Sequence, residues 1–385
     1  MIYLDYSANF PVNDEVLEEF LKTEKHYFGN TNSSHKLGIE SLKKYEELNL
    51  KILNLLSLNK DEYEVVFTSS ASEANNLAIK GIYSSYSGLG KHILASPFEH
   101  SSVSATLGYL KETGADVELL NVNNDGNISI DDLKSKLRND TILLCMILVE
   151  SETGKIQPYK EVIEILKDYP NCHLLIDATQ ALCKIDIDYN GIDMFSFTPH
   201  KFGGIIGTGF LIKRKETILT PLIHGGLSTS IYRSSTFPLG LFSSSIKAIE
   251  IGYNNLNVNY TKVKEIYDYL INNLKKFNEV ELNTFFDFPY ILNISIKDKK
   301  ASDVVSYLSN NDICVSQKSA CSIKNTPSKT IFSIYHDKKR ALSSFRISLS
   351  YLTTKEEIDK FIKVIGAYIN EWSQKEKSNN RSIFW

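Results

Sequence analysis

From residue 64 to residue 213, short apolar stretches alternate with polar segments that have a helical or loop pattern. Alternation of this kind predicts a mostly parallel β-sheet with helices on both faces. The expected fold class is therefore α/β. The stretches with the length and composition of buried strands are residues 64–68, 92–97, 116–122, 141–149, 173–178, 194–198 and 207–213.

The pattern changes after residue 243, where the order of helical and strand-like segments predicts a smaller α+β domain. We predict a large domain over residues 1–250 and a small C-terminal domain over residues 251–385, with about the first 15 residues packed against the small domain. The polar residues 373–381 lack apolar periodicity, which predicts a frayed end. The expected elements of the small domain are a long helix through residues 260–277, strands at 291–296 and 345–350, and an amphipathic helix over 355–372.

The composition is that of an ordinary globular protein, with 385 residues and a net charge of −3. This charge disfavours direct nucleic-acid binding. No apolar run is long enough to span a bilayer, and the first residues lack the basic and apolar regions of a signal peptide. We therefore expect a cytoplasmic protein with no membrane partner. The five cysteines form no CxxC pair, which argues against a metal site and a disulfide scaffold.

Two residues at successive strand ends suggest a site for pyridoxal 5'-phosphate (PLP). Asp177 closes an apolar strand, and Lys201 lies between the next strand and a glycine-rich turn. Alone, each has an ordinary interpretation, because a lysine beside glycines is usually solvated and an aspartate at a strand end often caps a helix. PLP chemistry needs a lysine that holds the aldehyde as a Schiff base and a carboxylate that keeps the ring nitrogen protonated. The order of the two residues, at the edge where α/β sheets bind ligands, favours a PLP site.

Several polar residues near these positions are candidate ligands for the phosphate group. Residues 67–76 join a strand to a helix through small hydroxyl residues, whose hydroxyls and backbone N–H groups can converge on an anion. The alternative is an ordinary serine-capped helix. Thr198 and His200, directly before Lys201, supply further ligands and favour the phosphate interpretation. The polar loop 233–236 is either another source of phosphate ligands or a surface loop.

His100 and Gln180 are candidates for contacts with the cofactor ring. His100 follows a strand end, on the edge of the sheet where ligands bind. A lone histidine is more often structural, but an imidazole at this position can lie on the ring and exchange protons with a substrate. Gln180, three residues after Asp177, can donate to the phenolate oxygen of the cofactor.

Arg346 and Cys321, near the C-terminus, bear on which substrate such a site takes. Arg346 lies within an apolar strand pattern and needs an anion there, either a substrate carboxylate or a structural salt bridge. Cys321 differs from the other four cysteines, which lie in apolar segments. It precedes the polar residues 323–340, which we expect to form an exposed loop. Nearby lysines favour an ionised, nucleophilic thiol.

Together these motifs resemble the cysteine desulfurases of the class V aminotransferase family, which are PLP enzymes of fold type I. The resemblance runs almost from end to end. It implies a large domain with a mostly parallel seven-stranded sheet flanked by helices, and a smaller α+β domain that carries the catalytic cysteine. The matching segments are residues 3–8, 28–35, 67–81, 99–100, 152–154, 156–158, 177–180, 200–203, 233–236, 319–321, 346–348 and 353–358.

The resemblance also implies a role for each matching residue. Thr236 corresponds to a threonine that reaches the phosphate of the neighbouring subunit's cofactor, which implies a homodimer with shared sites. The other implied roles are Lys201 as the Schiff-base lysine, Asp177 on the pyridine nitrogen, Gln180 on the phenolate oxygen, His100 stacked on the ring, Ala71, Ser72, Thr198 and His200 on the phosphate, Asn32 and Arg346 on the substrate carboxylate, and Cys321 as the sulfur-accepting nucleophile.

The implied activity is the PLP-dependent conversion of L-cysteine to L-alanine, with the sulfur captured as a persulfide on Cys321 and passed to an acceptor protein. The acceptor is left open among iron–sulfur scaffolds, tRNA-thiolation proteins and DNA-phosphorothioation proteins. The alternatives are a selenocysteine lyase or another β-lyase of the family, and a degenerate scaffold subunit without activity.

The chain departs from the family pattern at a few positions. Ser151 stands where an asparagine usually contacts the cofactor oxygen and the substrate carboxylate, and a shorter side chain weakens that contact. The turn 204–207 and the loop 233–236 also differ from the usual sequences, and Lys318 replaces a glycine before the catalytic cysteine. None of these changes removes a group that performs covalent chemistry.

Overall fold

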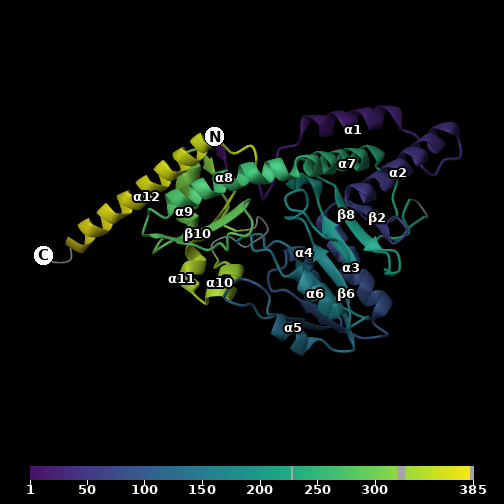
Figure 1. Ribbon diagram of the computed structural model, residues 1–385, viewed down its shortest axis with the longest axis horizontal. Helices are drawn as coiled ribbons and strands as arrows, with labels where there is room; N and C mark the ends of the chain where they lie inside the picture. The colour runs from purple at the N-terminus through teal and green to yellow at the C-terminus, as the bar shows by residue number, and fades with distance from the viewer. Residues whose placement is uncertain (227–228, 319–325, 382–385) are drawn as a thin grey trace.

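The structure is a computed structural model that describes residues 1–226, 229–318 and 326–381. Two parts of the molecule lie side by side in Figure 1, each built around its own sheet, and helices α7 (Leu239–Asn254) and α8 (Leu256–Leu274) run from one part to the other. We call the part with the larger sheet the large domain and the other the small domain. The division at residue 250 stays a prediction, and that position lies inside α7.

The large domain is built on a seven-stranded sheet with the strand order β2-β8-β7-β6-β5-β3-β4. Its strands are parallel except for β8, which is antiparallel to both of its neighbours. The mostly parallel sheet that the sequence predicts is therefore confirmed. The strands are β2 (Tyr63–Thr68), β3 (His92–Ala95), β4 (Asp116–Leu119), β5 (Thr141–Ile147), β6 (His173–Asp177), β7 (Met194–Phe197) and β8 (Gly209–Arg214).

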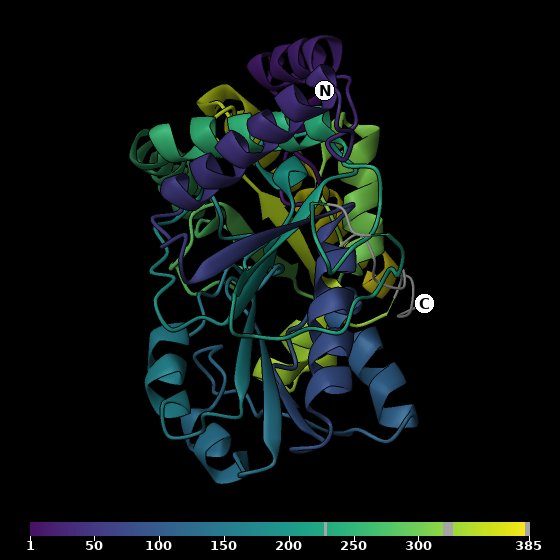
Figure 2. The ribbon, with the colours of Figure 1, turned by 90° about the vertical axis from the view of Figure 1, so that its right-hand side faces the viewer.

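Helices cover both faces of this sheet, as Figure 2 shows from the side. Every residue of β5 is buried, because a central parallel strand has one face against each helical layer. The apolar residues form two main cores, and one of them continues from the sheet into the small domain, where it includes Phe361. The remaining helices of the large domain are α1 (Asp14–His26), α2 (Lys36–Leu55), α3 (Ala71–Tyr86), α4 (Ser101–Glu112), α5 (Ile130–Lys136) and α6 (Tyr159–Leu166), with the short 3₁₀ turn η1 (Pro199–Lys201).

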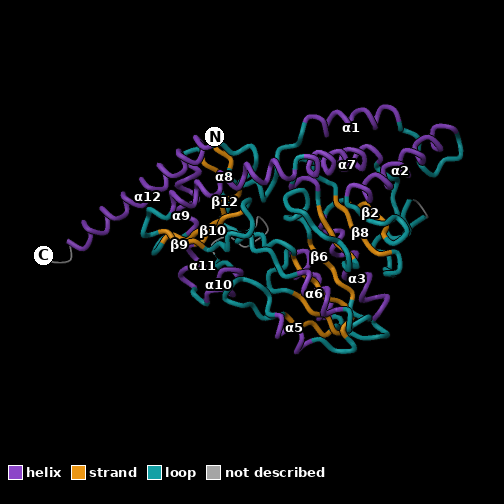
Figure 3. Tube along the Cα trace, viewed as in Figure 1, coloured by secondary structure: helices purple, strands orange, loops and turns teal. Residues whose placement is uncertain are grey.

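The small domain has a three-stranded antiparallel sheet, with the order β12-β10-β9, and a two-stranded parallel sheet of β1 and β11. The pairing of Ile2 with Ile313 joins the N-terminal residues to this domain. Its strands and helices, shown in Figure 3, are β1 (Ile2–Tyr3), β9 (Val280–Leu282), β10 (Ile291–Ile296), α9 (Ala301–Asn310), β11 (Ile313–Cys314), α10 (Lys329–Tyr335), α11 (Lys338–Ser343), β12 (Ser344–Ser348) and α12 (Lys355–Arg381).

The structure corrects two expectations about the C-terminal part. The stretch from Thr326 to Arg340 is not one exposed loop, because Ser328 and Asp337 cap the helices α10 and α11, and Ile331 is fully buried. The backbone of α12 also continues helical to Arg381, through the stretch that we expect to fray. Within the described residues, no helix combines the length and apolarity that crossing a membrane requires.

Candidate active site

A cavity of about 290 Å³ lies at the carboxyl edge of the large sheet, where β6 and β7 end and α3 and α4 begin. Edges of this kind are the usual ligand sites of open α/β sheets. Residues from both domains line it. The predicted site residues among them are Ala71, Ser72, His100, Ser151, Asp177, Gln180, Thr198, His200, Lys201 and Arg346.

Asp177 is a buried carboxylate at the end of β6, on the wall of this cavity. Its Oδ1 accepts a hydrogen bond from the Thr179 N–H at 3.0 Å, and its Oδ2 accepts one from Asn75 Nδ2 at 3.1 Å. Asn75 is fully buried in α3 and its Oδ1 accepts from Ser196 Oγ at 2.6 Å. Two donors, one on each carboxylate oxygen, therefore hold the Asp177 side chain in one orientation. Asn75 lies within the predicted phosphate motif but has no role in the sequence analysis.

Lys201 ends the 3₁₀ turn that follows β7, and its amine points toward the N-terminal segment. Lys201 Nζ donates to the carbonyl oxygens of Ser7 at 2.9 Å and Ala8 at 2.7 Å. Gln180 Nε2 donates to the same Ser7 carbonyl at 3.0 Å. The N-terminal segment thus forms a wall of the cavity and brings Lys201 and Gln180 together.

A second lysine, Lys184, lies buried behind the cavity and was not found by the sequence analysis. Its Nζ donates to Gln180 Oε1 at 2.9 Å. Burial, together with the nearby charges of Lys201 and Arg346, lowers the pKa of Lys184 to about 7. A lysine in the apolar run that follows Gln180 was the only available signal in the sequence. The basic side chains of Lys184, Lys201 and Arg346 therefore converge on this site, which favours anionic ligands such as a phosphate and a carboxylate.

The N-terminus of α3 supplies the predicted phosphate cradle. Ser70 is the N-cap, and its side chain accepts a hydrogen bond from the Glu73 N–H at 3.1 Å. Ala71 and Ser72 follow in the first turn, where backbone N–H groups lack partners within the helix. The serine-capped helix is present, and it is compatible with a phosphate site because a capped N-terminus can also bind an anion. The phosphate interpretation stays a prediction.

Thr198 and His200 line the same cavity as this helix terminus. Thr198 Oγ1 donates to the Thr208 carbonyl at 2.7 Å and lies 2.8 Å from His200 Nδ1. Since the threonine hydroxyl proton is directed at the carbonyl, the neutral imidazole donates its Nδ1–H to Thr198. Burial and the positive charges of Lys201 and Lys184 lower the pKa of His200 to about 4.

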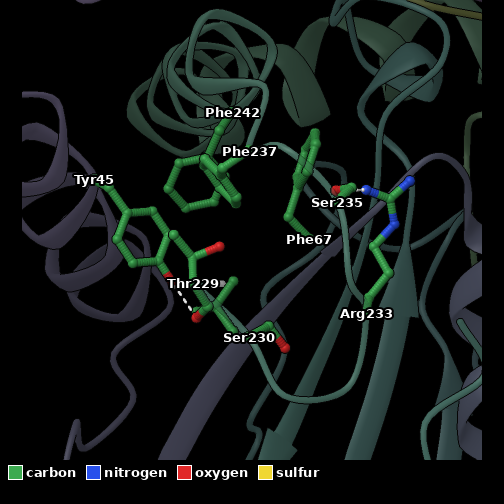
Figure 4. Close-up of a pocket in the computed structure, with 9 residues that line it drawn as sticks. Tyr45, Phe67, Thr229, Ser230, Arg233, Ser235, Phe237 and Phe242 are labelled. Atoms are coloured by element: carbon green, nitrogen blue, oxygen red, sulfur yellow. Dashed lines mark hydrogen bonds between the residues drawn. The ribbon is translucent and has the colours of Figure 1, made fainter. Parts of the chain in front are cut away.

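The loop that contains Arg233 packs next to the phosphate cradle, beside an aromatic cluster that Figure 4 shows. Arg233 Nε donates to Glu73 Oε1 at 2.9 Å and its guanidinium also contacts Ser235. Burial alone would raise the pKa of Glu73, but hydrogen bonds from Ser69 and the charge of Arg233 outweigh it and lower this pKa. The ion pair fixes the loop on α3, next to the exposed Thr236.

His100 is the N-cap of α4 and lines the same cavity as Lys201. Its Nδ1 accepts from the Ser102 N–H at 3.2 Å and lies 2.9 Å from Ser102 Oγ. The neutral imidazole therefore carries its proton on Nε2. Ser102 Oγ also accepts from Asn75 Nδ2 at 3.0 Å, so His100 and Asp177 share one polar network.

Arg346 lies in β12 and reaches the cavity from the small domain, with only 1% of its surface exposed. Its Nη2 forms an ion pair with Asp5 Oδ1 at 3.0 Å, and its Nη1 donates to the Ser151 carbonyl at 2.8 Å. Its buried Nε has no hydrogen-bond partner in the described part of the chain. The structural salt bridge considered in the sequence analysis is present, and the arginine also lines the ligand cavity.

Two predicted site residues, Asn32 and Thr236, do not line this cavity. Asn32 is exposed in a turn, where its N–H bonds the side chain of Asn30 at 2.9 Å. Thr236 is also exposed and lies outside the cavity lining. Cys321 lies outside the described residues. The roles predicted for all three stay predictions.

His92, Asp116 and Glu118 lie close enough together to hold a metal ion. Arg138, however, pairs with Asp116 at 2.6 Å and lies 3.7 Å from Glu118. Because a guanidinium already neutralises both carboxylates, we assign no metal site here.

The family follows from the whole chain as well as from this cavity. Residues 2–361 match the class V aminotransferase family. The chain belongs to this family. A cysteine desulfurase IscS from Dictyoglomus turgidum is 33% identical over 393 residues, which cover 98% of this chain and 99% of the relative.

Solved structures of family members agree with the fold. The structure of a NifS-like protein is similar with a TM-score of 0.89 and 28% identity, and the match covers 96% of this chain and 99% of that one. The structure of SspA in complex with cysteine is similar with a TM-score of 0.78 and 28% identity, and covers 92% of this chain and all (100%) of that one. The comparisons confirm the predicted family and fold type.

Proposed function

We propose that this member of the class V aminotransferase family is a PLP-dependent cysteine desulfurase that passes sulfur from L-cysteine to an acceptor protein. The observation that carries the proposal is the single cavity that joins Asp177, Lys201 and Arg346. Likeness to cysteine desulfurases over nearly the full length of the chain supports the same activity. Relatives of this family depend on PLP, and the donors around the cavity fit that cofactor.

The residues that would hold PLP match its chemical groups. The buried carboxylate of Asp177 fits a protonated ring nitrogen, and the N-terminus of α3 with Thr198 and His200 fits a phosphate. Lys201 would provide the amine for the covalent link. PLP, when bound, supplies an electron sink for the carbanion of an amino acid substrate.

The protein groups around the reacting atoms divide the remaining tasks. Arg346 would bind the substrate carboxylate, and its ion pair with Asp5 keeps the guanidinium oriented. Lys201, once released by the substrate, would move the α-proton, and His100 Nε2–H would donate a proton on the ring side. The Cys321 thiolate would attack the substrate sulfur, which leaves a persulfide on the protein and releases alanine.

The test is to incubate the purified holoenzyme with L-cysteine and a thiol reductant and to measure alanine and sulfide. We expect equal amounts of both, and loss of both in Lys201→Ala. Product no greater than that of Lys201→Ala would overturn the proposal. Cys321→Ser is expected to lose activity on L-cysteine, whereas full retention would indicate direct β-elimination, as in a β-lyase or a selenocysteine lyase.

The partners are also proposals. We propose a homodimer in which Thr236 reaches the site of the neighbouring subunit. This threonine is exposed, and the ion pair of Arg233 with Glu73 holds its loop close to the phosphate cradle. The acceptor remains an iron–sulfur scaffold, a tRNA-thiolation protein or a DNA-phosphorothioation protein. A cytoplasmic location is part of the same proposal.

A further inference from the structure

Asp5 occupies a position between two parts of the candidate site. Its Oδ1 forms the ion pair with Arg346 Nη2 at 3.0 Å, and its Oδ2 accepts a hydrogen bond from Ser316 Oγ at 2.7 Å. The two oxygens of one carboxylate therefore contact the arginine at the cavity and a residue of the segment that leads to Cys321. No role was predicted for either Asp5 or Ser316 from the sequence.

The backbone around Asp5 is held from both sides. Ser316 and Arg346 exchange backbone hydrogen bonds at 3.2 Å and 2.7 Å. The Leu4 N–H donates to the Cys314 carbonyl at 2.9 Å, and the Ser348 N–H donates to the Leu4 carbonyl at 2.8 Å. The N-terminal segment thus lies between the strand that holds Arg346 and the residues just before Ser316.

The charge of Asp5 matters because Arg346 is almost completely buried. A buried guanidinium without an anion is strongly unfavourable, so Asp5 balances its positive charge when no substrate is present. A substrate carboxylate would then be a second anion beside the same guanidinium. Asp5 therefore weakens the attraction for substrate while it fixes the orientation of Arg346.

The hydrogen bond between Asp5 and Ser316 bears on sulfur transfer because Ser316 lies close to Cys321 in the sequence. Ser316 precedes Cys321 by five residues in the sequence. The bond to Asp5 is a side-chain link between Arg346 and the start of that segment, since Ser316 and Arg346 share one carboxylate. A movement of the Asp5 side chain therefore changes the position of Arg346, which would bind the substrate. It also changes the contact with Ser316, which precedes the segment with Cys321.

We propose that Asp5 is a positioning residue that couples Arg346 to the base of the segment carrying Cys321, through Ser316. This inference rests on the proposed desulfurase function. The two contacts of Asp5 have separate roles. The Arg346 side controls how substrate carboxylate is bound, and the Ser316 side controls how readily the Cys321 thiolate meets the substrate sulfur.

Two substitutions separate these tasks. Asp5→Asn keeps the size of the side chain but removes the negative charge next to Arg346. Ser316→Ala removes only the bond on the Ser316 side and leaves the Arg346 ion pair in place. Ser309→Ala, on an exposed serine of α9, is the matched control for the loss of a hydroxyl group in the small domain.

The holoenzyme of each variant is tested in two assays. Binding of L-alanine, which has no sulfur, is followed by the absorbance change of the cofactor and reports on Arg346 without Cys321. The rate of persulfide formation on Cys321 is followed by mass spectrometry after a single addition of L-cysteine. For Ser316→Ala we expect unchanged L-alanine affinity and persulfide formation about tenfold slower, the size of effect from one lost hydrogen bond.

For Asp5→Asn we expect L-alanine affinity equal to or tighter than that of the wild type, with slower persulfide formation. Ser309→Ala should match the wild type in both assays. Amide hydrogen exchange at Ser316 in the apoprotein should be faster in both test variants, which is a readout independent of turnover. If Asp5→Asn does not fold, Ser316→Ala alone decides.

A wild-type persulfide rate in Ser316→Ala would overturn the coupling. Equal losses of affinity and rate in both test variants would also overturn it, since they would indicate general structural damage. Failure of the proposed function has a different signature. In that case the wild type itself would give no absorbance change with L-alanine, or no persulfide with L-cysteine.

Discussion

At the scale of single residues, the candidate site depends on how its charged groups are held. Asp177 and Lys201 are recognisable from sequence because each follows an apolar strand, but their partners are not. Asn75 appears in the sequence as one polar residue in a polar stretch, yet the structure buries it completely between Asp177 and Ser196. Its importance comes from contacts with residues that are far away in the sequence. Asp177 is 102 positions away and Ser196 is 121 positions away.

Substitution of Asn75 should therefore destabilise the protein more than substitution of its neighbour. Asn75→Ala leaves the Ser196 hydroxyl unpaired and removes a donor from Asp177, and a cost of about 1–3 kcal/mol is expected for each buried group left unsatisfied. The Asn76 side chain donates to the Ser72 carbonyl in the same helix, and Asn76→Ala should change stability by no more than about 0.5 kcal/mol. Urea unfolding of the apoproteins measures both. Equal losses would mean that the network around Asp177 contributes little.

At the scale of elements, the phosphate cradle is shaped by the close contact between the turn before α3 and β8. Gly209 in β8 lies directly under this turn, and a Cβ atom built on it would lie 2.1 Å from the carbonyl carbon of Ser70. Such a distance is far inside van der Waals contact, so the turn has to move if any side chain is present. A glycine at this point lets the N-terminus of α3 reach the cavity.

Gly209→Ala is expected to displace Ser70 and Ala71, to cost about 1–3 kcal/mol of stability, and to weaken PLP binding. The matched control is Gly108→Ala in α4, where a Cβ atom meets nothing within 4 Å and alanine favours the helix. That variant should be as stable as the wild type or slightly more stable. Thermal unfolding of the apoproteins and titration with PLP are the measurements. Wild-type PLP affinity in a folded Gly209→Ala would contradict this account of the cradle.

The elements also show what the sequence could predict. The large sheet was predictable because its central strands, such as β5, are apolar on both faces and the strands alternate with helices over a long stretch. The helices α10 and α11 were not, because seven and six residues are too few to display a clear period of 3.6. The ion pair between Asp5 and Arg346 joins residues that are 341 positions apart, and no local sequence pattern predicts such a contact. Residue types at strand ends suggested the cofactor, while the contacts that orient them required the fold.

At the scale of the whole molecule, two buried carboxyl groups connect the domains beside the active site. Glu152 Oε2 accepts from Ser328 Oγ at 2.5 Å, and Glu150 Oε1 accepts from Thr330 Oγ1 at 3.2 Å. Both acids follow β5 in the large domain, and both hydroxyls belong to the small domain. Burial is the main reason that the pKa of Glu152 rises to about 7, and repulsion from Glu150 adds to it, although Ser328, Arg346 and Lys318 oppose the rise.

This raised pKa predicts how stability depends on pH. The folded protein keeps a proton on Glu152 up to about pH 7, whereas the unfolded chain releases it near 4.5. The folded state therefore binds more protons between these values, and the contribution of Glu152 to stability is fully present below pH 4.5 and is lost as the pH rises through 7. The slope from one group is at most about 1.4 kcal/mol per pH unit.

Glu152→Gln removes this dependence, because a glutamine resembles the protonated acid at every pH. Relative to the wild type, the variant should gain stability as the pH rises from about 5 to about 7 and should keep a constant advantage above that pH. The difference between the two proteins isolates Glu152 from other groups such as His200. Glu161→Gln, on an exposed position of α6, is the control and should keep the slope of the wild type. Urea unfolding at each pH measures the three proteins. If Glu152→Gln and the wild type run parallel across this range, Glu152 does not hold a proton between the domains, and the contact with Ser328 is made by a charged carboxylate instead.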